Sequence, residues 1–149
     1  MVTLSTDKLA DLVAKRHRCL AQLRDLGRKQ AELIAVGGMG PLLRLFSAKN
    51  QLIVAVQALE HELAPFHAQD PEDRDWTSAT ARQECAEQAT ACRGLLDEIM
   101  QLERDNEQRM TERRDQVTKQ LQASQAVSVA RGAYQAQQTT RTRIDQPVI

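Results

Sequence analysis

The chain has 149 residues, of which 42% are hydrophobic and only 3% aromatic, and its 20 Lys and Arg side chains balance 20 Asp and Glu side chains. This length suits a single hydrophobic core, and the zero net charge excludes the strong overall field with which a protein holds a nucleic acid or an acidic membrane surface. Leu, Ala, Gln, Arg and Glu dominate the sequence. That composition is typical of long helices and predicts an all-α fold.

The sequence also bears on the compartment. No run approaches the roughly 18 apolar residues of a membrane span, and "MVTLSTDKLADLV" lacks the basic region and apolar block of a secretory signal. The three cysteines form no CxxC pair, which favours a reducing environment. We therefore expect a cytoplasmic protein with free thiols and no stable membrane insertion.

Two amphipathic runs open the chain. Apolar residues recur at intervals of three and four, which predicts helices over residues 5–36 and 41–66, the first capped by Ser5 or Thr6. Arg16 and Lys49 occupy equivalent positions in the two apolar stripes. We expect their aliphatic stems to pack at the seam between the helices while their charges reach water.

A glycine-rich break, "VGGMGPLL" at residues 36–43, separates these runs. Gly37 and Gly38 can adopt the left-handed conformations that end a helix, and Pro41 suits the first turn of the next one, where its missing N–H is not needed. Two amphipathic stripes joined by so short a turn predict an antiparallel helical hairpin.

A third apolar stripe follows the polar linker at 67–76 and predicts a long helix over 77–131. Its register changes at Asn106, where the heptad pattern calls for an apolar residue, and it resumes sparsely afterwards. The Gln-, Thr- and Ser-rich end predicts a disordered tail over 136–149. The predicted organisation is one elongated, coiled-coil-like helical domain over 1–135, followed by this flexible tail.

The predicted helix lengths do not match. At 1.5 Å per residue the second helix spans roughly 40 Å and the third roughly 80 Å. The hairpin is therefore too short to pack along the whole third helix, and the contact should end near residues 103–110. An uncovered amphipathic helix is only marginally stable by itself. We therefore expect its apolar stripe to receive a helix of a partner, with the contact residues Met110, Arg114, Val117, Leu121 and Val127. Tyr134, the only tyrosine, lies outside any predicted core and is a second candidate for a partner contact.

No motif for catalysis or metal binding survives inspection. "HELAP" begins at His61 like the zinc motif HExxH, but Pro65 stands where the second histidine is required. Cys85 and Cys92 are better explained as apolar core residues than as zinc ligands. The basic cluster "AKRHRC" has no interleaved aromatics and is interpreted as a solvated helix face. The sequence predicts no enzyme, cofactor, metal site or nucleic-acid partner.

Three segments resemble the FlgN family of flagellar export chaperones. The segment "LRDLGRKQAELIAVGGMGPLLRLFSAKNQLIVAVQALEHEL", residues 23–63, is similar to the end of the family's first helix, its short break and its second helix. "LLDEIMQLERDNEQRM", residues 95–110, and "ARGAY", residues 130–134, are similar to the long C-terminal helix and the Ala-Tyr near its end. The resemblance covers residues 8 to about 135.

The resemblance implies a cytosolic chaperone for hook-associated proteins, the junction components between flagellar hook and filament. Such a chaperone keeps the terminal helices of its clients from polymerising and delivers them to the export gate protein FlhA. It also implies that Tyr134, in its Ala-Tyr context, contacts the export gate. The alternative is a structural coiled-coil adaptor or homodimer, without an export function, whose third helix pairs with itself.

Overall fold

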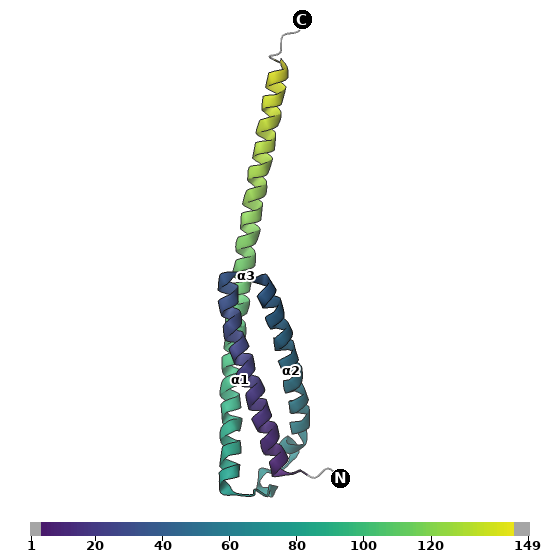
Figure 1. Cartoon of the computed structure of the whole chain (residues 1–149), viewed down its shortest axis with the longest axis vertical. Coiled ribbons are helices and arrows are strands. Elements are labelled where there is room, and N and C mark those ends of the chain that lie inside the picture. Colours follow the sequence, from purple (N-terminus) through teal and green to yellow (C-terminus); the bar gives the residue numbers. More distant parts are fainter. Residues whose placement is uncertain (1–3, 145–149) are drawn as a thin grey trace. The chain divides into compact units, whose positions relative to one another are not determined.

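The computed structural model describes residues 4–144, and the side chains of residues 4–140. It contains the helices α1 (Thr6–Val36), α2 (Met39–Ala68) and α3 (Ala79–Ile144), with a short 3₁₀ helix, η1 (Pro71–Asp73), between α2 and α3 (Figure 1). The described residues include no strand. The predicted all-α class, a hairpin followed by a long third helix, is therefore confirmed. The chain divides into two compact units, unit 1 at residues 1–107 and unit 2 at residues 108–149.

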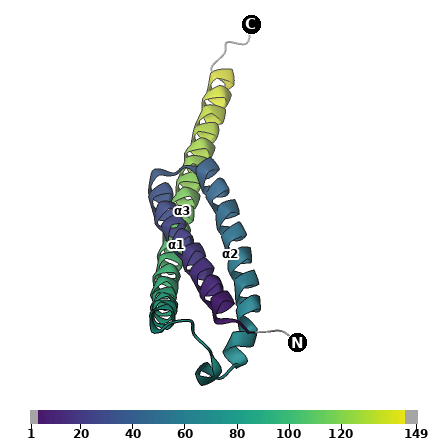
Figure 2. The ribbon, with the colours of Figure 1, turned by 60° about the horizontal axis from the view of Figure 1, so that its bottom comes forward.

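The hairpin forms as the break between the two runs predicts. Ser5 caps α1 by accepting a hydrogen bond from the Asp7 N–H, and Gly37, with φ 85°, ends it by donating its N–H to the Leu33 carbonyl at 2.8 Å. Gly38 is extended, with φ −79°, so one left-handed residue suffices where we expected two. In Figures 1 and 2, α1 and α2 lie side by side and run in opposite directions.

The linker between α2 and α3 is tied back to the start of α1. The Thr6 hydroxyl donates to the Asp75 carbonyl at 2.8 Å. The Asp70 side chain caps η1 by accepting from the Glu72 N–H, and the Ser78 hydroxyl accepts from the Ala81 N–H in the first turn of α3. These bonds satisfy backbone and hydroxyl groups that would otherwise lack partners where the chain turns.

All three helices contribute side chains to the core of unit 1, and the first part of α3 lies alongside α1 (Figures 1 and 2). The cluster nearer the linker consists of Leu9, Leu12, Val13, Leu59, Leu63, Phe66 and Cys85. A second cluster consists of Leu20, Leu23, Cys92 and Leu95, with Leu52 and Val56 packed against it. The interpretation of Cys85 and Cys92 as core residues is confirmed, because both are buried free thiols.

The third helix is longer than predicted. It continues past residue 131 to Ile144 and so includes residues 136–144, part of the segment for which we predicted a disordered tail. No proline occurs between residues 79 and 144, and the many Ala and Gln residues here favour helix. The hydroxyls of Thr139 and Thr140 also bond to carbonyls four residues earlier instead of competing with the helix. The remainder of the predicted tail, 145–149, lies outside the described residues.

Within residues 4–144, no helix is both long enough and apolar enough to cross a membrane.

Candidate functional site

Buried polar residues occur in unit 1 where the apolar register of α3 changes. Asn106 is 1% exposed and donates its side-chain N–H to the Gly27 carbonyl of α1 at 2.9 Å. Its side-chain oxygen, Oδ1, is buried and accepts no hydrogen bond from the residues that the structure describes. Gly27 permits this approach, because a Cβ at that position would lie 3.3 Å from the Leu102 Cδ1 atom. The departure from the heptad pattern at Asn106 therefore marks an α1–α3 contact.

Lys49 joins all three helices close to this contact. Its ammonium group donates to the Gln30 side-chain oxygen at 2.8 Å and pairs with Glu103. Lys49 is only 7% exposed, so our expectation that its charge reaches water was wrong. The ammonium group stays inside because Gln30 and Glu103 replace the hydrogen bonds that water would provide. Arg16, by contrast, is partly exposed and pairs with Glu60 on α2.

Burial along α3 stops directly after Asn106. Met110 is half-buried, and every described side chain from 111 to 140 is exposed. The prediction that packing against the third helix ends near residues 103–110 is thus confirmed, because no described side chain after Asn106 is buried. The exposed part includes large apolar residues, with Val117 46%, Leu121 59%, Val127 51% and Tyr134 62% exposed. Unit 2 therefore presents apolar side chains that its own helix does not cover.

Helical geometry separates the predicted contact residues into two faces. At about 100° per residue, Met110, Arg114, Val117 and Leu121 fall within about 60° of one another around the helix axis. We call these four residues the unit 2 stripe. Val127 lies about 100° away from Met110, on the face that carries Tyr134 seven residues later. The Tyr134 hydroxyl accepts a hydrogen bond from Gln138 at 3.0 Å, and its ring is exposed.

A division of charge coincides with the boundary between the units. Residues 1–107 carry 17 acidic and 13 basic side chains, whereas residues 108–144 carry seven basic and two acidic ones. No acidic residue occurs between Asp115 and Asp145. Our sequence reasoning missed this feature because it used the charge of the whole chain, in which the two halves cancel. A count of charge per predicted segment would have found it.

Two of the cysteines, Cys85 and Cys92, are buried thiols in unit 1. Burial raises the pKa of Cys85, opposed by nearby Arg74, and burial likewise raises the pKa of Cys92, opposed by Arg16. Raised pKa values keep both groups in the unreactive thiol form. Among residues that the structure describes, no three His, Cys, Asp or Glu side chains gather where a metal ion could be held.

A family model described as "FlgN protein" matches residues 1–142. The chain belongs to the FlgN family. FlgN proteins are flagellar export chaperones for hook-associated proteins, and the family is non-enzymatic. The match includes the exposed helix of unit 2 as well as unit 1. No curated protein and no solved structure matches the chain.

Proposed function

We propose that the unit 2 stripe binds the amphipathic terminal helix of a hook-associated client. The observation that carries this proposal is the continuous exposure of residues 111–140 in a helix that presents Val117 and Leu121 on one face. A client helix laid along it buries apolar surface on both partners, at about 25 cal/mol per Å² before the entropy costs of association. A terminal helix held in this way is no longer free to assemble prematurely.

The basic character of unit 2 defines the client further. Lys and Arg side chains outnumber acidic ones by seven to two over residues 108–144. A client segment with carboxylates beside its apolar face matches this charge, which speeds association and fixes the register of the two helices. Arg114, within the stripe, has a highly exposed side chain whose nearest acidic partner is Asp115 at 3.7 Å, so its guanidinium can bind a client carboxylate.

We place the chaperone in the cytoplasm, where it holds the client until export. Delivery requires a surface that the bound client leaves accessible, and the face with Tyr134 lies away from the stripe. Tyr134 is accordingly the proposed contact to the export gate protein FlhA. Val127 shares the face of Tyr134, so a client helix confined to the stripe leaves both residues accessible, whereas one that also touches Val127 must cross the unit 2 helix at an angle.

The decisive test places charges in the stripe. Val117→Glu combined with Leu121→Glu should weaken binding of a full-length hook-associated protein by about tenfold or more, because carboxylates are then desolvated against the client's apolar face. The matched control, Ala126→Glu with Ala130→Glu, adds the same charges on the opposite face and should change the affinity less than twofold. Isothermal titration calorimetry measures both, and circular dichroism verifies helix content. Equal affinities for the two double variants would refute the proposal.

The alternative is that the stripe pairs with itself in a homodimer. Sedimentation equilibrium over a concentration series distinguishes this homodimer from a chaperone that is monomeric when free. A chaperone whose stripe awaits a client stays monomeric when free. A self-pairing stripe gives a dimer that Val117→Glu with Leu121→Glu dissociates. In that case client binding should compete with dimerisation.

A further inference from the structure

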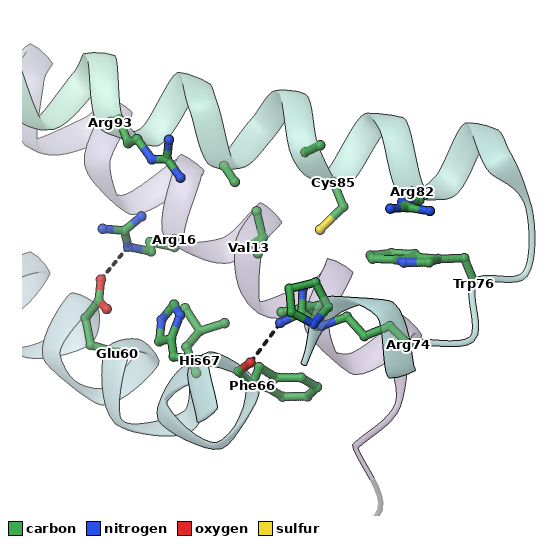
Figure 3. Close-up of a pocket in the computed structure, with 15 residues that line it drawn as sticks. Val13, Arg16, Glu60, Phe66, His67, Arg74, Trp76, Arg82, Cys85 and Arg93 are labelled. Carbon is green, nitrogen blue, oxygen red and sulfur yellow. Dashed lines mark hydrogen bonds and ion pairs between the residues drawn. The ribbon is translucent and has the colours of Figure 1, made fainter. Parts of the chain in front are cut away.

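Unit 1 contains a cleft at its linker end. It has a volume of about 510 Å³ and is bordered by α1, α2, the linker and α3 (Figure 3). This volume is within the range of sites that bind ligands, about 300–1,000 Å³. Its apolar lining includes Val13 of α1 and Leu63 and Phe66 of α2, all buried. The cleft lies wholly within unit 1 and is separate from the unit 2 stripe.

The cleft exists because α3 presents short side chains here. Cys85, Ala86 and Ala89 line it from α3, and their spacing of three and four places them on one helix face. Opposite them stand the larger Leu63 and Phe66. Short side chains on one wall leave space that larger apolar residues would fill in a closed core.

Basic side chains outnumber acidic ones in the lining of the cleft. Four arginines line the cleft, and among the described lining residues Glu60 is the one acidic side chain. Glu60 is already paired with Arg16 (Figure 3). Arg74 donates to two neutral oxygens, the Phe66 carbonyl at 2.7 Å and the Gln69 side chain at 3.3 Å. Most of the positive charge in the cleft is therefore left without an opposite charge.

Arg82 and Arg93 complete the α3 wall at the two ends of its small-residue stretch. Both are exposed, and neither guanidinium forms a hydrogen bond or ion pair with the residues that the structure describes. Their Cα atoms are eleven residues apart along α3, or about 16 Å. Each of these guanidinium groups can pair with a carboxylate. The arrangement therefore suits a ligand that carries carboxylates next to apolar side chains, which would enter the apolar hollow.

We propose that this cleft binds an acidic polypeptide segment, which inserts apolar side chains between Phe66 and Ala89 and pairs its carboxylates with Arg82 and Arg93. The separation of the two arginines favours a polypeptide over a small anion, because only an extended ligand reaches both across the apolar hollow. The inference rests on the proposed function in one respect, which is that the segment comes from the hook-associated client. The chaperone then holds its client at two places, one in each unit.

The probes are overlapping 15-residue fluorescent peptides that cover the hook-associated proteins of the same genome, titrated with the full-length chain. We expect at least one acidic, apolar peptide to bind and to lose about tenfold in affinity with Arg82→Glu plus Arg93→Glu, since attraction becomes repulsion. Ala86→Leu, which fills the cleft from an exposed position, should weaken the same peptide. Fluorescence anisotropy gives each dissociation constant.

Matched controls distinguish an effect of the cleft from a general effect of the changed net charge. Arg44→Glu plus Arg104→Glu makes the same charge change at exposed positions of unit 1 outside the cleft, and Ala91→Leu is the control for Ala86→Leu. These controls should change the affinity less than twofold. Equal losses in the cleft and control variants, or the absence of any peptide sensitive to Arg82 and Arg93, would overturn the inference.

A further comparison keeps this inference distinct from the proposed function. Val117→Glu plus Leu121→Glu should leave the cleft peptide unaffected while weakening the full-length client. If the full-length client does not bind the wild-type chain at all, the proposed function fails. If it binds but no peptide depends on the cleft, the second site fails alone.

Discussion

Lys49 and Asn106 place polar atoms in positions where the helical pattern calls for apolar side chains. Both are buried, and both make hydrogen bonds to another helix of unit 1. A buried polar group that keeps its hydrogen bonds adds little net stability. A different packing of the helices that left its partners unpaired would cost much more free energy. These two residues therefore fix the register of the three helices more than they add to stability, which is the function that a buried polar residue has in a coiled coil.

Replacing Lys49 shows what its hydrogen bonds contribute. Lys49→Met keeps the aliphatic stem but leaves the buried Gln30 side-chain oxygen without its donor, so the free energy of unfolding should fall by about 1–3 kcal/mol. The exposed Lys29→Met in α1 is the matched control and should change it by less than about 0.5 kcal/mol. Urea denaturation followed by circular dichroism measures both. A Lys49→Met protein as stable as the wild type would show that Gln30 finds another donor.

Two helical glycines of unit 1 have opposite surroundings. A Cβ at Gly94 meets nothing within 4 Å, whereas a Cβ at Gly27 would lie 3.3 Å from Leu102. Gly94→Ala should therefore raise the free energy of unfolding by up to about 1 kcal/mol, the difference in helix propensity. Gly27→Ala should lower it, because the packed Leu102 side chain must move by a few tenths of an ångström to admit the new Cβ. Thermal unfolding compares the two variants, and the same sign of change in both would contradict the packing assigned to Gly27.

At the level of helices, the sequence was most informative where a pattern repeats. The intervals of three and four between leucines predicted α1, α2 and the hairpin, because a helix that buries one face needs that spacing. The end of α3 was not predicted, because Gln, Thr and Ala are compatible with both disorder and helix. The cleft was not predicted either. It depends on Ala86 and Ala89 facing Phe66, a pairing between residues distant in sequence that no local pattern specifies.

For the predicted contact residues too, some features follow from the sequence and others depend on how the helices pack. Exposure of Val117 and Leu121 followed from comparing helix lengths, which needs only the helical rise. The placement of Val127 with Tyr134 instead of with Leu121 also follows from helical geometry and was open to inference. The pairing of Arg16 with Glu60 could not be predicted, because it depends on how the helices pack against one another. The same holds for the absence of such partners for Arg82 and Arg93 among the described residues.

The whole molecule combines an acidic, packed unit 1 with a basic unit 2 whose described side chains are almost all exposed. Every buried side chain among the described residues lies between Thr6 and Asn106. The folding free energy of the chain therefore comes almost entirely from unit 1, since an exposed helix gains little from its own hydrogen bonds. Unit 2 offers exposed side chains instead of a core, as the proposed binding of a client requires.

Truncation tests this division. A fragment of residues 1–107 retains every buried residue among those described, so its melting temperature should stay within about 2 °C of the full-length chain. Its affinity for a hook-associated client should fall with the loss of the unit 2 stripe. A fragment of residues 1–103 is the sharper comparison, because it removes Asn106 and exposes the Gly27 contact. It should melt at a distinctly lower temperature. Calorimetry of the two fragments thus locates the end of the folded core, and an early melt of the 1–107 fragment would mean that unit 2 stabilises unit 1.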